Sequence, residues 1–153
     1  MAHIELVTRI AAPVQVVFDL SRSIDAHLGS MEHGRERAVA GVTSGLIELG
    51  QTVTWKARHF GIPFTMTSEI SEMEPPTRFV DRQVRGPFHR FRHEHRFEDD
   101  GGATVMTDVI DFDSPLGPIG RVVDRVALER YLASLIATRN EFLRRQAEAH
   151  PTP

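Results

Sequence analysis

Polar and apolar residues alternate with a period of two along residues 86–97, which read G-P-F-H-R-F-R-H-E-H-R-F. Because successive side chains of a strand point to opposite faces of its sheet, this pattern predicts a strand with two very different faces. The aromatic and imidazole face would carry Phe91, His93, His95 and Phe97. The charged face would carry Arg90, Arg92, Glu94 and Arg96. The first face is too apolar for water and too polar for an ordinary core, so we expect it to form the wall of a cavity.

The same patterns divide the rest of the chain into strands and helices. Alternation predicts strands over His3 to Ile10, Arg35 to Ala40, Gln51 to Phe60, Phe64 to Met73, Arg78 to Arg85, Phe88 to Glu98 and Thr104 to Asp113. Apolar residues at helical spacing predict short helices over Val14 to Leu20 and Ser21 to Leu28, and a long amphipathic helix from about Ile119 to about Ala147. Pro13 suits the start of the first helix, and Ser23 is a candidate N-cap of the second.

Short connections join most of the predicted strands. The segment Asp99 to Gly102 is a strong hairpin signal, and Pro75-Pro76 is a firm break. Short connections favour an antiparallel meander, and a curved meander buries its inner face by packing on the long helix. We therefore predict a single α+β domain over residues 1–149, followed by a frayed tail at 150–153.

The composition narrows the function classes without choosing one. The hydrophobic fraction of 41% and the charged fraction of 25% are ordinary for a globular chain of 153 residues, and a net charge of −3 gives no steering toward nucleic acid. The absence of cysteine excludes disulfides and thiolate chemistry. No apolar run approaches the roughly 18 residues of a membrane span, and the N-terminus lacks the pattern of a signal peptide. We expect a cytoplasmic protein, and the excess of arginine over lysine suggests a GC-rich bacterial genome.

Three segments carry a resemblance to a known superfamily. They are A-A-P-V-Q-V-V-F-D-L after the first strand, F-V-D-R-Q-V-R-G-P-F-H-R-F-R-H-E-H-R-F in the middle, and S-P-L-G-P-I-G before the last helix. The chain resembles the START-like (SRPBCC) ligand-binding superfamily, which includes polyketide cyclases, lipid-transfer domains and birch-pollen-type allergens, and the middle block resembles its bacterial cyclase/dehydrase-like branch. The resemblance implies a helix-grip fold, with a seven-stranded sheet around the C-terminal helix and an apolar cavity between them. It does not imply a single activity.

Strand register gives the two histidines acidic neighbours. The hairpin at residues 99–102 would place His93 or His95 beside Asp108, and the preceding strand would bring Asp81 near His93 or Phe91. A carboxylate that orients an imidazole forms a general acid–base pair, so the candidate catalytic residues are His93, His95, Asp108 and Asp81. The same groups could instead satisfy one another in a polar cavity wall.

The cavity would bind a small hydrophobic or aromatic molecule, of lipid, polyketide or phenolic type, and a cyclase or dehydratase is the alternative. The expected ligand-binding residues are Trp55, His59, Met66, Phe79, Gln83, Phe91, Phe97, Met106, Ile110, Leu135 and Arg139. Arg139 would either bind an anionic group or extend its head to solvent. His27 and His33 would lie near the rim, where His27 either caps a ligand or is an ordinary surface residue.

No motif for a cofactor is present, and we expect none. His93-x-His95 could contribute two ligands to a metal site, with His59 or Asp108 as the third, but such a pair recurs by chance and we predict no metal.

The charged face of the predicted sheet is the remaining candidate surface. It would carry Arg78, Arg82, Arg90, Arg92 and Arg96. Nucleic-acid binding would need aromatic residues on the same face, and here they point inward, so we expect no nucleic-acid partner. A solvated face paired with acids such as Glu69 is expected, and a protein-docking surface is the alternative. The oligomeric state stays open, with a homodimer as one expectation.

Overall fold

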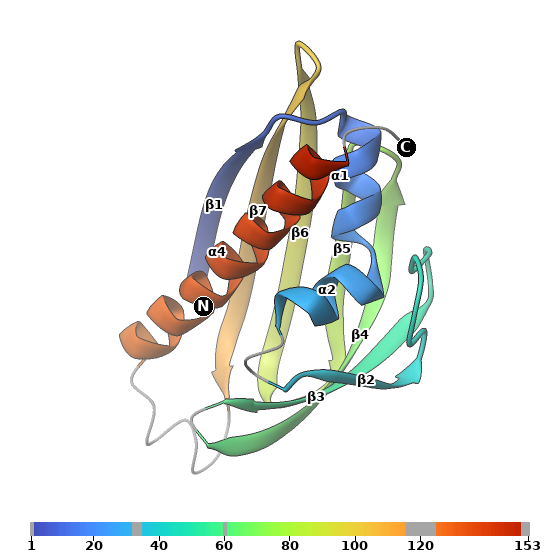
Figure 1. Cartoon of the computed structure of the whole chain (residues 1–153). Coiled ribbons are helices and arrows are strands. Elements are labelled where there is room, and N and C mark those ends of the chain that lie inside the picture. The colour runs from blue at the N-terminus through green and yellow to red at the C-terminus, as the bar shows by residue number, and fades with distance from the viewer. Residues whose placement is uncertain (1, 32–34, 60, 116–124, 151–153) are drawn as a thin grey trace.

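The computed structural model describes residues 2–31, 35–59, 61–115 and 125–150 (Figure 1). In this part of the chain seven strands form one antiparallel sheet in the order β1-β7-β6-β5-β4-β3-β2. The strands are β1 (Ala2–Ile10), β2 (Arg37–Gly41), β3 (Thr52–His59), β4 (Ile62–Glu74), β5 (Arg78–Arg85), β6 (Phe88–Asp100) and β7 (Ala103–Pro115). The helices are α1 (Val14–Ser21), α2 (Ile24–Ser30) and α4 (Arg125–Ala149).

The sheet is a meander whose first strand returns to pair with its last. Strands β2 to β7 follow one another in order, and β1 pairs antiparallel with β7. The tight hairpin between β6 and β7 is made by Gly101 and Gly102, whose positive φ angles of 62° and 91° suit glycine. Figure 1 shows α4 crossing one face of the curved sheet, with α1 and α2 beside it on the same side. This arrangement confirms the predicted helix-grip fold.

The two short helices form as the sequence predicts. α1 begins directly after Pro13, and α2 is capped by Ser23, whose side chain accepts a hydrogen bond from the Ala26 backbone amide at 3.1 Å. Ser21 belongs to the end of α1, so the second helix begins at Ile24, three residues later than predicted from the pattern. The part of the long helix predicted before Arg125, the segment S-P-L-G-P-I-G beyond residue 115, and residues 151–153 of the tail lie outside the described residues.

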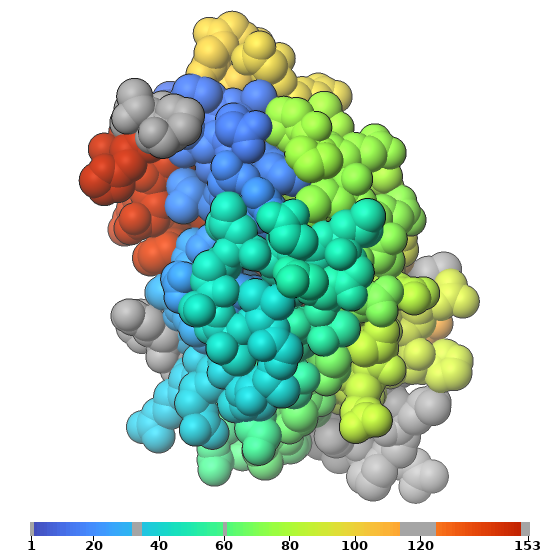
Figure 2. All heavy atoms as spheres, turned by 90° about the vertical axis from the view of Figure 1, so that its right-hand side faces the viewer, coloured from blue at the N-terminus to red at the C-terminus, as the bar shows by residue number. Residues whose placement is uncertain are grey.

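The core fills the end of the sheet under α1 and the flank under α4. Under α1 the ring of Phe18 meets Phe79 and Phe97 edge-on, with centroids 5.7 and 5.4 Å apart. Under α4 a second cluster packs Ile110 and Phe112 of the sheet against the helix. Within the described residues, no helix combines the length and the apolar character that crossing a membrane requires. In the space-filling view of Figure 2 the segment with β2 and β3 (teal) lies in front, between the helices α1 and α2 (blue) and strands β4 and β5 (green).

Candidate functional site

A cavity of about 170 Å³ lies between the concave face of the sheet and the helices. Nine of its nineteen lining residues are aromatic or aliphatic, namely Ile24, Ile47, Val53, Trp55, Met66, Ile70, Phe79, Phe91 and Ile136. Its charged and imidazole groups are Arg22, His27, Glu36, Asp81, His93, His95 and Arg139, and its hydroxyl groups are Ser21, Ser23 and Ser68. A concave wall that combines apolar side chains with polar groups at defined positions is typical of a small-molecule site.

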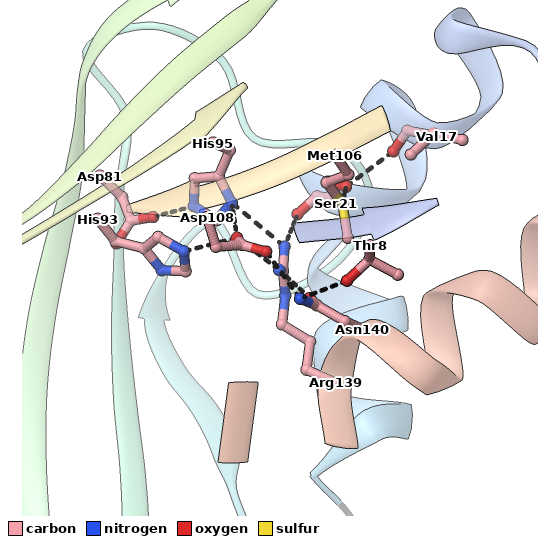
Figure 3. A network of polar contacts seen from close by, with 10 residues as sticks. All are labelled: Thr8, Val17, Ser21, Asp81, His93, His95, Met106, Asp108, Arg139 and Asn140. Atoms are coloured by element: carbon pink, nitrogen blue, oxygen red, sulfur yellow. Dashed lines mark hydrogen bonds and ion pairs between the residues drawn. The ribbon is translucent and has the colours of Figure 1, made fainter. Parts of the chain in front are cut away.

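Strands β5, β6 and β7 bring two histidines and two aspartates together on the concave face. In the register of the sheet His93 lies opposite Asp81, and His95 lies opposite Asp108. The shortest hydrogen bonds, however, run diagonally between neighbouring strands. His93 Nε2 lies 2.7 Å from Asp108 Oδ1, and the imidazole of His95 lies with its Nε2 2.7 Å from Asp81 Oδ2. The two imidazole rings stack with their centroids 3.7 Å apart, so the four side chains form one connected group (Figure 3).

Asp108 is the centre of this group and has no exposed surface. Its Oδ1 also lies 3.2 Å from His95 Nδ1 and 3.3 Å from Arg139 Nη1, and its Oδ2 accepts a hydrogen bond from Asn140 Nδ2 at 2.8 Å. Burial alone would raise the pKa of Asp108, but the hydrogen bonds from His93 and His95 and the charge of Arg139 hold it well below its usual value. Asp108 is therefore a carboxylate that only accepts hydrogen bonds.

Arg139 reaches this carboxylate from α4 and is only 3% exposed. Its guanidinium donates to Asp108 Oδ1, to Asn140 Oδ1 at 3.0 Å and to the Ser21 carbonyl at 3.3 Å, and it lies 3.4 Å from His95 Nδ1. Figure 3 shows the head turned toward Asp108. The expectation that Arg139 extends its head to solvent is therefore wrong, because a buried carboxylate holds the head inside.

His93 offers a hydrogen-bond acceptor to the cavity. Burial and the neighbouring His95 lower the pKa of His93, and the hydrogen bond to Asp108 only partly opposes them, so the ring is neutral near pH 7. Because Asp108 can only accept, the Nε2 of His93 carries the proton and its Nδ1 carries a lone pair. That Nδ1 has no hydrogen bond to any described residue, and the ring lines the cavity.

Asp81 provides a second acceptor at the same place. Its side chain is 21% exposed and lines the cavity, and its Oδ2 is held by His95. Burial alone would raise the pKa of Asp81, but the hydrogen bond from His95 and the nearby positive charges lower it. Its Oδ1 has no hydrogen bond within the described part of the chain. A polar ligand group would therefore meet a lone pair and a carboxylate together.

His27 and Trp55 form another part of the wall, between α2 and β3. Their rings pack with centroids 4.3 Å apart, and His27 Nε2 lies 2.8 Å from Glu36 Oε1. All three side chains line the cavity, so His27 is more than an ordinary surface residue. Glu36 was not predicted, because no periodic pattern links it to His27. His33 lies outside the described residues.

The structure divides the expected ligand-binding residues into two groups. Those that line the cavity are Trp55, Met66, Phe79, Phe91 and Arg139, together with Asp81, His93 and His95. Those that do not are His59, Gln83, Phe97, Met106, Ile110 and Leu135, together with Asp108, which lies behind His93.

The residues of the second group do not line the cavity because it occupies only part of the concave face. Phe97 and Met106 belong to the core under α1, and Ile110 belongs to the cluster under α4. On α4, the neighbouring Ile136 lines the cavity where Leu135 was expected. Correct facing on a strand therefore does not guarantee contact with the cavity.

Two polar members of that group have partners elsewhere. His59 Nδ1 lies 2.8 Å from the Tyr131 hydroxyl. Gln83 bonds both the backbone carbonyl and the backbone amide of Phe88, at 2.7 and 3.2 Å, and so fixes the turn between β5 and β6.

Asn140 is a site residue that was not predicted from the sequence. Its amide donates to Asp108 Oδ2 and lies 3.3 Å from the Thr8 hydroxyl of β1, which links α4 to the sheet. The signal in the sequence was its position directly after Arg139, since these two residues are buried and the two before them are exposed.

Among the described residues, possible metal-ligand atoms of Asp81, His93 and His95 lie within 4.8 Å of one another. This set differs from the predicted one, because His59 is bonded to Tyr131. Both ring nitrogens of His95 and the Nε2 of His93 already contact carboxylates. The atoms of this set without a partner among the described residues are therefore His93 Nδ1 and Asp81 Oδ1, fewer than the three or four protein ligands of a typical zinc site.

Four of the five arginines expected on the outer face, Arg78, Arg82, Arg92 and Arg96, pair with glutamates of the same sheet. Arg82 lies 3.3 Å from Glu69, as expected, and Arg78 lies 2.5 Å from Glu72. Glu94 bonds Arg92 at 2.9 Å. Since these cations already have acidic partners, the face is a network of ion pairs.

A curved sheet that wraps a long C-terminal helix and encloses a partly apolar cavity defines a helix-grip protein of the START-like superfamily. The chain matches the family described as polyketide cyclase / dehydrase and lipid transport over residues 1–148, and it belongs to that family. This confirms the resemblance found in the sequence. A search of curated protein sequences found no match.

Solved structures share the fold over nearly the whole chain. They include the Zhui aromatase/cyclase of Streptomyces sp. R1128, with 19% identity, a TM-score of 0.70 and 99% of each chain covered. A START superfamily protein of Mycobacterium smegmatis has 10% identity and a TM-score of 0.74, covering 96% of this chain and 97% of the other. A protein of Thermus thermophilus has 16% identity and a TM-score of 0.71, covering 93% and 97%. At these identities the likeness concerns the fold alone.

Proposed function

We propose that the protein binds a small apolar or aromatic molecule in the cavity between the sheet, α2 and α4. The observation that carries the proposal is the cavity wall itself, in which aromatic and aliphatic side chains surround two hydrogen-bond acceptors, His93 and Asp81. The family description, which names lipid transport beside cyclase and dehydrase, agrees with a ligand of this kind.

Trp55 makes the proposal testable without a label. It is the single tryptophan of the chain and it lines the cavity, so its fluorescence should change when a ligand enters. We expect a saturable change on titration with neutral aromatic compounds. A rise in the thermal midpoint should accompany it, because a ligand of the native state stabilises that state.

A pair of variants separates the cavity from the surface. Ser68 is buried and lines the cavity, so Ser68→Phe should fill the space and abolish the titration. Thr65 lies on the same strand but is exposed and outside this cavity, so Thr65→Phe should leave the titration unchanged. Unchanged binding by Ser68→Phe, or no response to any of the compounds, would contradict the proposal.

A second candidate function is acid–base catalysis on the bound molecule. The observation that favours it is the neutral ring of His93, which lines the cavity with its proton held on Nε2 by Asp108 and with an Nδ1 that has no partner among the described residues. Such an imidazole can take a proton from a carbon next to a carbonyl, and Asp108 would stabilise the imidazolium that forms. Return of the proton to carbon or loss of a hydroxyl would complete an enolisation or a dehydration.

Deuterium exchange tests this second function directly. If His93 is a base, the protein should speed the incorporation of deuterium from heavy water into the methyl group of acetophenone. His93→Phe should remove this acceleration, while the exposed control His89→Phe should retain it. The exchange rate could instead be equal with and without the wild-type protein, under conditions where Trp55 fluorescence reports binding. That result would reject catalysis and retain ligand binding as the function.

A further inference from the structure

The size and polarity of the cavity narrow the class of ligand, and this step rests on the proposed function. A cavity of about 150 Å³ accommodates benzene, whereas pockets for drug-sized molecules have roughly 300–1,000 Å³. At about 170 Å³, the cavity has room for one aromatic ring with a short substituent. The enclosed space favours a single ring, and fused rings or long acyl chains would extend beyond it.

Two polar atoms of the wall that are unpartnered within the described part of the chain accept hydrogen bonds and do not donate them. His93 presents the lone pair of Nδ1, and Asp81 presents its Oδ1, and neither atom has a partner among the described residues. A ligand group that donates a hydrogen bond would supply either atom with a partner. A hydroxyl group is the smallest such group, and it fits the one-ring volume.

The main donor near these acceptors is already in use. The guanidinium of Arg139 bonds Asp108, Asn140 and the Ser21 carbonyl. Both ring nitrogens of His95 face carboxylates, at 2.7 Å from Asp81 and 3.2 Å from Asp108. A ligand carboxylate at this place would therefore meet the carboxylate of Asp81, with the neighbouring cation already engaged by Asp108. The site disfavours fatty acids and benzoates.

The walls beside these acceptors are flat. The ring of Phe79 stacks on His95, with centroids 4.1 Å apart and an angle of 15° between the planes, and Trp55 and Phe91 also face the cavity. Flat aromatic walls favour a flat ligand. From the volume, the two acceptors and these walls, we infer that the ligand is a neutral phenol with a single ring, whose hydroxyl donates to His93 Nδ1 and lies beside Asp81.

The test compares compounds that differ in one property at a time. Para-cresol is titrated into the wild-type protein beside toluene, which lacks the hydroxyl, para-toluate, which is anionic, and naphthol, which has two rings. Trp55 fluorescence and calorimetry report binding. We expect para-cresol to bind at least about tenfold more tightly than each of the other three, because a site built for a hydroxyl discriminates strongly against its absence.

A variant tests which atom accepts the hydrogen bond from the ligand hydroxyl. His93→Phe keeps a ring of similar size and removes Nδ1, so the ratio of para-cresol to toluene affinity should fall to about one, largely through weaker para-cresol binding. His89→Phe changes an exposed histidine of the same strand and should leave the ratio unchanged. If His93→Phe does not fold, nitrogen NMR of labelled wild-type protein gives the same answer. The Nδ1 signal of His93 should shift on adding para-cresol and not on adding toluene.

The outcomes separate this inference from the proposed function. Tighter binding of naphthol or para-toluate than of para-cresol, or an unchanged affinity ratio in His93→Phe, overturns the phenol class and leaves ligand binding in place. Failure of all four compounds to bind overturns both. Preference for para-cresol, lost in His93→Phe and kept in His89→Phe, supports both.

Discussion

The inner and outer faces of the sheet both carry networks of ionisable side chains, with buried carboxylates at Asp108 and Glu94, and the two networks differ in the access of their cations to water. On the inner face, Asp108 is fully buried and is surrounded by His93, His95 and Arg139. On the outer face, Glu94 is the shared partner of Arg78, Arg92 and Arg96. Each network has a carboxylate at its centre.

The difference lies in what happens to the cations when the central carboxylate is lost. The side chains of Arg92 and Arg96 are 35% and 53% exposed, so their heads can return to water. The head of Arg139 cannot, because it lies between α4 and the sheet. The same kind of ion pair therefore adds little on the outer face and is required on the inner face. A network that is required for folding can also hold His93 in one orientation. Ligand binding or a reaction at Nδ1 requires this fixed orientation.

The largest expected effect comes from matched substitutions of the two central carboxylates. Asp108→Asn removes the charge without changing the shape and places an amide donor against three donors, so it should cost about 3–5 kcal/mol of the free energy of unfolding. Glu94→Gln makes the same chemical change at a buried carboxylate on the outer face, but its arginine partners can turn to water, so it should cost less, about 1 kcal/mol. Urea denaturation of both variants and of the wild-type protein measures the difference.

The comparison has a built-in control, because both substitutions lie on the same hairpin of β6 and β7 and change one charge each. Equal losses of unfolding free energy in the two variants would show that burial of the inner cations does not increase the cost of removing their carboxylate. A smaller loss in Asp108→Asn than in Glu94→Gln would reverse the distinction between the faces.

An intermediate effect is expected in the pH dependence of stability. The native pKa of His93 lies below its unfolded value of 6.5, so below that pH the unfolded chain binds a proton that the native protein does not. Stability is therefore fully present above about pH 6.5 and falls on acidification, by at most about 1.4 kcal/mol per pH unit for this one group. The pKa values of Asp81, Asp108 and Glu94 are lowered from acidic starting values, so these groups act at lower pH.

His93→Phe isolates this contribution. Thermal unfolding between pH 7.5 and pH 5 should show a shallower loss of stability in the variant than in the wild-type protein. His59, whose pKa is lowered by burial, contributes in the same direction and is present in both proteins, so its effect cancels in the difference. A steeper pH dependence in the variant would mean that His93 is protonated in the native state and would remove its role as an acceptor.

Most of the architecture could be predicted from the chain, because facing on a strand depends only on sequence parity. Alternation placed His93, His95 and Asp108 on one face, and the turn at residues 99–102 fixed the register that brings them together. The diagonal choice of hydrogen-bond partners could not be predicted, since it depends on side-chain rotamers.

The site was harder to predict where it depends on packing between elements. Arg139 could be placed on the buried side of the helix, but its partner depends on how α4 crosses the sheet. The extent of the cavity depends on how far the core under α1 reaches, which excluded Phe97 and Met106. The contact of His27 with Trp55 likewise depends on how α2 packs over β3.

The smallest expected effect is a difference between the two faces in how salt changes the stability cost of each substitution. The Debye length shortens from about 10 Å at 0.1 M salt to about 3 Å at 1 M, which screens exposed charges far more than buried ones. Because the arginine partners of Glu94 reach water and Arg139 does not, the cost of Glu94→Gln should shrink by a few tenths of a kcal/mol over this range, while the cost of Asp108→Asn stays the same. Urea denaturation at both salt concentrations measures each cost, with the wild-type protein at the same salt as reference. An equal reduction in both variants would mean that water and ions reach the carboxylate of Asp108, and the inner network would then be no more protected than the outer one.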